Sequence, residues 1–253
     1  MFKYMKYELK GTYKFMLAII FAVLFATTGI QFFINNKIND ARNAMIMNYL
    51  PFLMMMFMLI IFGALIAATI FIINSYRKEL YEDRGYLTFT LPLTGRQFLG
   101  SKLVVALFWY IAIAIALVIY NGILGTILFG NGWITQLFRV FNDYDFGIIA
   151  INNSIISILS SIITMLLVYF SITLSRVSFK NTKIGGIWFI LFLLFKWVYS
   201  FLNHWIIIKL SDVDNLHSYM TSAISVPSII FSIIVGIGLF LGTSYLIEKK
   251  IDL

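Results

Sequence analysis

One glycine-bearing run in this sequence has the residue types of a phosphate-binding loop. Gly95-Arg-Gln-Phe-Leu-Gly-Ser-Lys102 brings two glycines, a hydroxyl and a lysine close together. In a phosphate-binding loop the lysine precedes the Ser or Thr, because the lysine must reach the β- and γ-phosphates while the hydroxyl binds magnesium. Here that order is reversed, and the run leads straight into an apolar segment. We therefore predict that the chain has no nucleotide site and is not itself an enzyme.

The residue types also exclude thiol and metal chemistry. The sequence has no cysteine, and its two histidines, His204 and His217, do not fall in an HExxH-type pattern. No acidic residue lies within the apolar segments, where a proton-coupled pump would carry one. The chain therefore has no energy source of its own, which favours a channel or a permease driven by another subunit.

The composition places the chain in a membrane. Of its 253 residues 61% are hydrophobic and 12% are charged, against about half and about a quarter in soluble domains. This excludes an ordinary soluble domain and a disordered chain. The net charge of +8 does not indicate nucleic acid, because the basic residues flank apolar spans, where they set membrane orientation.

Six apolar segments are long enough for the helix of about 20 residues that crosses a bilayer. They run roughly over residues 15–34, 49–74, 95–129, 148–174, 184–208 and 227–247. Thr94 and Gln97 have the spacing of a capping box, which predicts that the third helix starts near Gly95. We therefore predict an all-α integral membrane protein in which residues 1–253 form a single transmembrane domain.

The residues before the first span predict a helix lying in the membrane interface. In the segment 2–13, Phe2, Met5 and Leu9 share one helical face, and a neighbouring stripe is made of lysines. Gly11 is the expected bend into the first span. The alternative is a disordered basic leader.

The lysines and arginines set the orientation. With the N-terminus inside, the outer segments hold only Lys37, Arg42, Arg139 and Lys209 of the 19 basic residues, and Lys196 lies within a span. All the others fall in inner segments, which is a clear positive-inside bias. Both termini and residues 75–102 are therefore predicted to be cytoplasmic, in a multi-pass protein of the cell membrane.

The most specific pattern lies between the second and third spans, in residues 75–102. An acidic stretch is followed by Gly85, a Thr-Leu-Pro turn that ends at Pro92, and Arg96 at the head of the third span. This order resembles the cytoplasmic loop of ABC-2-type permease subunits, above all those that export peptide toxins and peptide antibiotics. The resemblance implies the ABC-2 permease fold, which is of the type V exporter kind.

The resemblance also implies a partner ATPase that carries ATP and magnesium. The family docks on its ATPase through a coupling helix, which here falls on Arg77, Lys78, Glu79, Leu80, Tyr81, Glu82, Asp83 and Arg84. The three carboxylates would face basic groups, and Leu80 and Tyr81 would anchor the docking. The alternative is a solvated charged loop that only sets topology.

Two sets of apolar residues are candidates for a substrate path. Methionines cluster in residues 45–58, including Met54, Met55 and Met58, and the fifth span carries Trp188, Phe192, Phe195 and Tyr199 at helical spacing. In the family that the chain resembles, the second and fifth spans line a cavity at the dimer interface. Methionine suits such promiscuous apolar surfaces. The alternative is ordinary packing or lipid contact.

Lys196 lies within the fifth span, about twelve residues or roughly 18 Å from the preceding loop. A charge at that depth usually faces a cavity or a partner. We expect it to face a wet cavity and to meet a carboxylate on a cargo. The alternatives are snorkelling, or a fifth helix that stops early with residues 203–208 forming a re-entrant piece.

Two patterns of small residues predict helix packing. The fourth span carries a polar stripe, and the sixth span has a Gly-x-x-x-Gly spacing at Gly238 and Gly242. The stripe is made of Asn153, Ser157, Ser160, Ser161 and Thr164.

Together these patterns predict the membrane-spanning permease subunit of an ATP-driven exporter. It would pair with a second permease subunit, as a homo- or heterodimer, and with cytoplasmic ATPase subunits. Its cargo would be hydrophobic or amphipathic. The alternative is an ion or solute channel, or a membrane scaffold, with no ATPase partner. A membrane enzyme is disfavoured because no nucleophile or metal site is evident.

Overall fold

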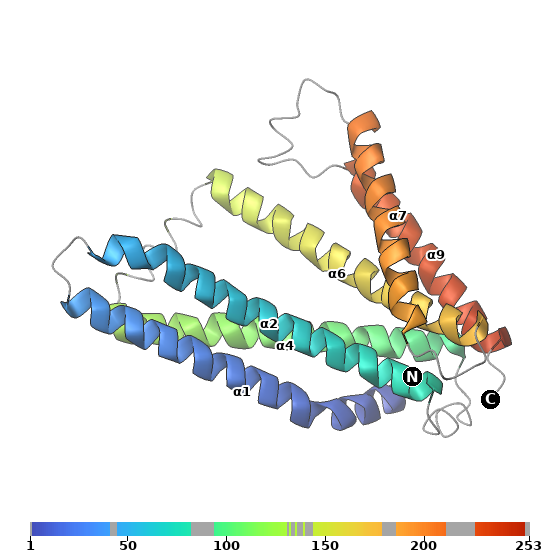
Figure 1. The fold of residues 1–253 in the computed structure, drawn as a ribbon, viewed down its shortest axis with the longest axis horizontal. Helices are drawn as coiled ribbons and strands as arrows, with labels where there is room; N and C mark the ends of the chain where they lie inside the picture. The colour runs from blue at the N-terminus through green and yellow to red at the C-terminus, as the bar shows by residue number, and fades with distance from the viewer. Residues whose placement is uncertain are drawn as a thin grey trace. The chain divides into compact units, whose positions relative to one another are not determined.

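The computed structural model describes residues 2–40, 45–81, 94–130, 132, 135, 139, 144–178, 186–210 and 226–250. Over these ranges the chain forms long α-helices and no strand (Figure 1). The helices are α1 (Phe2–Asp40), α2 (Met45–Tyr81), α4 (Gly95–Phe129), α6 (Tyr144–Ser178), α7 (Ile187–Leu210) and α9 (Val226–Lys250).

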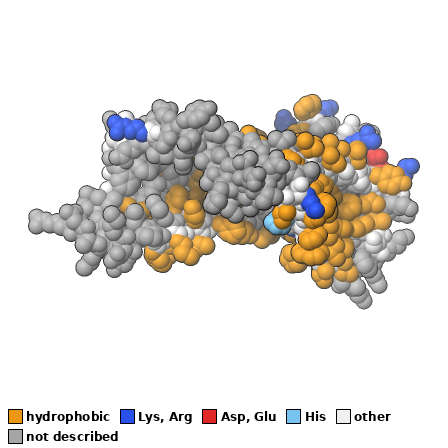
Figure 2. Space-filling view, turned by 90° about the horizontal axis from the view of Figure 1, so that it is seen from above, with side chains coloured by type: hydrophobic (Ala, Val, Ile, Leu, Met, Phe, Trp, Pro, Cys, Tyr) orange, Lys and Arg blue, Asp and Glu red, His pale blue; other side chains and the backbone are white. Residues whose placement is uncertain are grey.

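Each of these six helices contains a stretch long and apolar enough to cross a membrane. Helices suit that environment because every backbone polar group is paired within the segment. Figure 2 shows hydrophobic side chains over much of the described surface in that view, with few charged ones between them. Over the described residues the structure is all-helical, as predicted, and has six helices that are long and apolar enough to span a membrane, which indicates a multi-pass membrane protein.

The end of α2 differs from the sequence-based expectation, whereas the bounds of α4 agree with it. The helix α4 begins at Gly95 and ends at Phe129, as predicted. The helix α2 continues to Tyr81, past the predicted end near residue 74, because Tyr76 and Leu80 extend its buried face by one further turn.

The fifth helix, α7, is continuous from Ile187 to Leu210. The alternative of an early stop followed by a re-entrant piece at residues 203–208 is therefore wrong. Asn203 lies within the helix, and its side chain accepts a hydrogen bond from Ser228 Oγ at 2.7 Å.

The first helix, α1, runs unbroken through Gly11, so residues 2–13 are its N-terminal turns and not a separate helix. Figure 1 shows its ribbon changing direction in this N-terminal part. The placement of these turns in the membrane interface stays a prediction.

The chain divides into two compact units, and α2 and α4 contribute to both. One unit comprises residues 3–72 and 105–142. Its helices are joined by a buried side-chain pair, in which Trp109 Nε1 donates to Thr12 Oγ1 at 3.0 Å, and by the more exposed rings of Phe15 and Phe71, which stack at 4.1 Å. Hydrogen bonds between apolar helices contribute about 0.6 kcal/mol each. The prediction of a single transmembrane domain stays a prediction.

The other unit comprises residues 1–2, 73–104 and 143–253. Within it α6 packs against α7 and α9, and α7 packs against α9. Figure 1 shows α6 meeting the other two helices toward its C-terminal end. Buried hydroxyls on these helices, including Ser171 and Thr173, donate to the backbone carbonyl four residues earlier, which satisfies them without water.

Candidate functional site

A cluster of buried aromatic and polar side chains joins the end of α2 to the start of α4 and to α6. Tyr76 is at its centre and is fully buried. Its ring stacks on Tyr169 with centroids 4.2 Å apart, and its hydroxyl lies 2.7 Å from Thr173 Oγ1. Phe98 from α4 packs on the other side, at 5.9 Å. We call this set, with Glu79, Leu80 and Lys102, the junction cluster.

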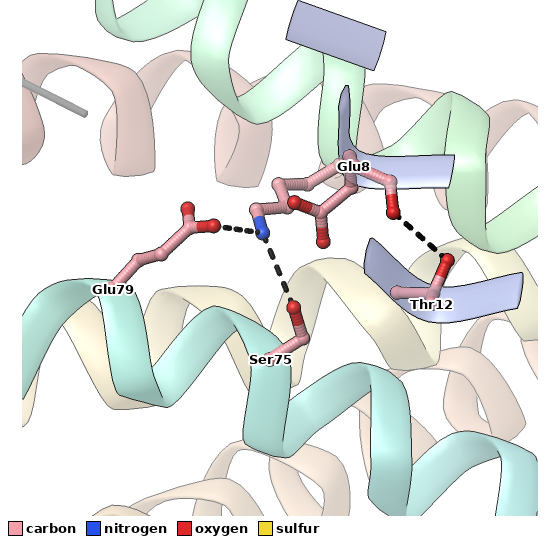
Figure 3. A network of polar contacts seen from close by, with 5 residues as sticks. Glu8, Thr12, Ser75 and Glu79 are labelled. Atoms are coloured by element: carbon pink, nitrogen blue, oxygen red, sulfur yellow. Dashed lines mark hydrogen bonds and ion pairs between the residues drawn. The ribbon is translucent and has the colours of Figure 1, made fainter. Parts of the chain in front are cut away.

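An ion pair links the two helices directly. Lys102 Nζ lies 2.7 Å from Glu79 Oε1 and donates a longer bond of 3.4 Å to Ser75 Oγ. The side chains of Lys102 and Glu79 are only 3% and 13% exposed. Figure 3 shows Glu79 and Ser75 one turn apart on α2, both reaching the same nitrogen. Because the pair is buried, water screens the attraction between the two charges only weakly. Removing either partner would leave an unpaired buried charge, which is strongly destabilising.

The first turn of α4 is held by three side chains. Gln97 N donates to Thr94 Oγ1 at 3.3 Å and Thr94 N donates to Gln97 Oε1 at 3.4 Å, which is the capping box that the sequence predicts. The carboxylate of Glu248, from α9, accepts from Gly95 N at 2.7 Å. A negative charge at a helix N-terminus also interacts favourably with the positive end of the helix dipole.

Position 95 requires glycine because α9 approaches it closely. A Cβ at Gly95 would lie 2.7 Å from the backbone oxygen of Ser244 and 2.9 Å from Glu248 Cγ. The backbone oxygen cannot move aside without shifting α9. The start of α4 is therefore fixed against α9, while its first turns are fixed against α2.

Gly95–Lys102, the run with the residue types of a phosphate-binding loop, forms the first turns of α4. Ser101 Oγ donates to the Gln97 carbonyl, and Lys102 is engaged by Glu79. Among the described residues there is no group of three or more His, Asp or Glu side chains that could hold a metal ion. The absence of a nucleotide site stays a prediction.

The residues predicted to couple to an ATPase fall into two groups. Arg77, Lys78, Glu79, Leu80 and Tyr81 form the last turns of α2, whereas Glu82, Asp83 and Arg84 lie outside the described residues.

Leu80 is 1% exposed, so it packs inside this chain and is not available as a docking anchor in this conformation. The carboxylate of Glu79 is likewise taken by Lys102. Tyr81 is covered by the Arg176 guanidinium, 5.3 Å from its ring centroid. The docking role of the segment stays a prediction.

A second feature is a pocket of about 520 Å³ between α6, α7 and α9. Lys196 lies on its wall, nine residues or about 14 Å from the start of α7. The apolar lining is made of Ile156, Leu159, Ile207 and Ile229. The polar lining includes Ser160, Lys196, Tyr199, Asn203, Ser228 and Ser232. Lys196 therefore lines a pocket within this unit, and its place in a wet cavity that meets a cargo stays a prediction.

Lys196 is held by neutral groups. Its Nζ donates to Thr164 Oγ1 at 2.8 Å and lies 5.7 Å from the centre of the Tyr199 ring. Over the residues that the structure describes, no carboxylate forms an ion pair with it. An intramembrane lysine costs about 3 kcal/mol on insertion scales, and one neutral hydrogen bond returns only about 1 kcal/mol.

Thr164, Ser228 and Ser232 were not recognised as site residues from the sequence. The polar stripe of the fourth span was attributed to packing, yet Thr164 binds Lys196 and Ser160 lines the pocket. The usable signal was spacing: Ser160 and Thr164, Ser228 and Ser232, and Lys196, Tyr199 and Asn203 each share one helical face.

The aromatic residues of α7 pack largely within the same unit. Phe195 lies 5.4 Å from Phe170 of α6, and Tyr199 stacks on Phe231 of α9 at 5.9 Å. Trp188 and Phe192 are half-buried. Phe195 thus has packing contacts, whereas Tyr199 both packs on α9 and lines the pocket; a substrate-path role for these residues stays a prediction.

The methionines of α2 belong to the other unit. Met55 and Met58 are exposed, and the side chain of Met54 lies outside the described residues. That they share a cavity with α7 stays a prediction. Of the two glycines in the Gly-x-x-x-Gly spacing, Gly242 lies near Phe170 of α6, at 3.6 Å from an added Cβ, whereas nothing comes within 4 Å at Gly238.

No protein-family model, curated protein or solved structure matches this chain. The likeness to ABC-2-type permeases therefore depends on the order of residues 75–102 and on the six apolar helices.

Proposed function

We propose that this chain is the membrane-spanning permease subunit of an ATP-driven exporter of the ABC-2 type. Two such subunits form the membrane part, and separate cytoplasmic ATPase subunits supply the work. The protein lies in the cell membrane, and both its termini and residues 75–102 face the cytoplasm. The cargo is hydrophobic or amphipathic, with peptide toxins and peptide antibiotics as the expected class.

The observation that supports this proposal most is the junction cluster. Together with the close approach of α9 to Gly95, it anchors the helices on both sides of the segment 82–93: Tyr76 and Leu80 are buried at the end of α2, and Gly95 is packed against α9 at the start of α4. A charged loop that only set topology would need no such anchoring. A segment that receives a push from a partner does need it, because a loose attachment would absorb the movement.

The same contacts suggest how the push would travel. The helix α4 is 35 residues long and continuous, so a displacement at its first turn moves it as a rigid lever. The Glu79–Lys102 pair ties the first turns of α4 to α2, and Glu248 ties the first residue of α4 to α9. Closure of the ATPases would thus move three helices together and switch the cavity outward.

The test is to purify the tagged chain from its native membranes in mild detergent and to identify bound proteins by mass spectrometry. We expect a stoichiometric soluble ATPase with a phosphate-binding loop. Reversing Glu82 and Asp83 to lysine should abolish its binding, because both carboxylates lie in the predicted docking segment.

Glu79 is better left intact in this test, since it pairs with Lys102 and its reversal would disrupt the chain itself. The matched control is Glu248→Gln. It removes a carboxylate charge from the cap of α4 without changing the docking segment, so the ATPase should still bind. Purification of the chain alone in every mild detergent would contradict the proposal and favour a channel or scaffold.

A further inference from the structure

The pocket between α6, α7 and α9 presents hydrogen-bond donors that are not used up. The hydroxyls of Tyr199 and Ser232 lie 2.8 Å apart, so one O–H bonds the other oxygen and the second remains available. Asn203 accepts from Ser228 through Oδ1, which leaves its side-chain N–H₂ free to donate. With the ammonium of Lys196, three kinds of donor line one wall.

The charge balance of the pocket calls for an anion. Lys196 is the ammonium group of the pocket, and no carboxylate is found among the described residues that line it. Thr164 binds Nζ through one hydrogen bond, whereas an ammonium has three protons to donate. A charge-assisted hydrogen bond to an anion is about twice as strong as a neutral one.

The size and the remaining lining indicate what carries the anion. The volume of about 520 Å³ is within the range of roughly 300–1,000 Å³ for small-molecule sites and far larger than a halide ion needs. Ile156, Leu159, Ile207 and Ile229 provide apolar wall beside the donors. We infer that the pocket binds the anionic end of an amphipath: a carboxylate or phosphate group attached to an apolar chain.

Lys196 supplies the charge that selects the anion, and Asn203 and the Tyr199–Ser232 pair orient it. Two sources share this chemistry, a free acyl carboxylate and the phosphate of an anionic membrane lipid. That the occupant is cargo rests on the proposed function, whereas the binding itself requires no ATPase.

The experiment uses the full chain in nanodiscs of phosphatidylcholine and a photoreactive palmitate as probe. Labelled peptides are mapped by mass spectrometry, and the half-saturating concentration is measured for each variant. We expect labelling within α6, α7 and α9. Lys196→Met should raise the half-saturating concentration at least tenfold, equivalent to about 1.4 kcal/mol, and Lys196→Arg should restore most of the binding.

Two further variants keep the test sharp. Lys209→Met removes an exposed charge from the last turn of the same helix and should leave the labelling unchanged. Ser160→Leu fills the pocket while retaining Lys196 and should also weaken binding at least tenfold, so a folding defect in Lys196→Met cannot alone decide the outcome.

Competition then identifies the source. Displacement by oleate but not by methyl oleate or phosphatidylglycerol assigns the pocket to a carboxylate amphipath; displacement by phosphatidylglycerol assigns it to a membrane lipid. Equal competition by oleate and methyl oleate, or unchanged labelling in Lys196→Met and Ser160→Leu, would overturn the inference. Neither result bears on ATPase binding, so the proposed function is judged separately.

Discussion

The ion pair between Glu79 and Lys102 gives the sharpest stability prediction. Lys102 is 3% exposed and Glu79 is 13% exposed, with 2.7 Å between Nζ and Oε1. Removing one partner of a buried pair costs about 3–5 kcal/mol, because the remaining charge has no compensation. Glu79→Met should be near the lower end, about 3 kcal/mol, since Ser75 Oγ still accepts from Lys102.

Replacing both partners should cost far less than the two single changes together. Exchanging a buried ion pair for apolar side chains commonly leaves stability unchanged. The double variant Glu79→Met with Lys102→Met should therefore have a free energy of unfolding within about 1 kcal/mol of that of the original chain. Since each single change should cost about 3 kcal/mol or more, the coupling free energy of the double-mutant cycle should reach about 5 kcal/mol.

The assay is thermal unfolding of the purified chain in detergent, followed by loss of helical circular dichroism. A loss of 3 kcal/mol lowers Tm by about 6–12 °C in a chain of this size class. Arg96→Met, an exposed change on the same helix, is the control and should stay within about 0.5 kcal/mol. Additive single effects, or single effects below 1 kcal/mol, would refute the reasoning.

Three further outcomes follow from the described contacts. Tyr76→Phe removes the hydrogen bond to Thr173 and should lower the free energy of unfolding by about 1 kcal/mol, seen as a lower Tm. Tyr245 is exposed, so Tyr245→Phe should leave Tm unchanged. Gly95→Ala should lower the free energy of unfolding by about 1–3 kcal/mol, because the added methyl group overpacks against Ser244 and Glu248. Gly122→Ala is the control and should be tolerated, since nothing lies within 4 Å of its added Cβ. Equal Tm values for the two variants would count against the close approach of α9 to Gly95. Because the chain has no cysteine, a single introduced cysteine reports which side of the membrane it is on. Ser178→Cys should react with a membrane-impermeant maleimide only in opened cells, whereas Thr135→Cys should react in intact cells. The reverse pattern would contradict the predicted orientation.

The sequence predicted the helices well because apolar length is a strong signal. The bounds of α4 followed from the capping box at Thr94 and from the apolar run that ends at Phe129. The end of α2 was placed too early because Arg77, Lys78 and Glu79 look like a loop in sequence. In the structure the buried side chains of Tyr76 and Leu80 extend the helix through this charged stretch.

The pocket was predictable only in part. Lys196 stands out because a charge is rare in an apolar span, and the structure places it on a cavity wall. Its partner Thr164 lies 32 residues away on another helix, and a pairing of that kind depends on how α6 and α7 pack. The pairing of Glu79 with Lys102, and of Gly95 with Glu248, depends on tertiary contact in the same way.

The most direct test of the proposed function places a photo-crosslinking amino acid at position 83 of the otherwise unchanged chain and irradiates intact cells. The account predicts a crosslinked adduct with an ATPase that carries a phosphate-binding loop, and no such adduct when the same amino acid replaces Thr135. An irradiated chain that yields no ATPase adduct from position 83, although it is present in the membrane at normal levels, would contradict the assignment as an ATP-driven permease.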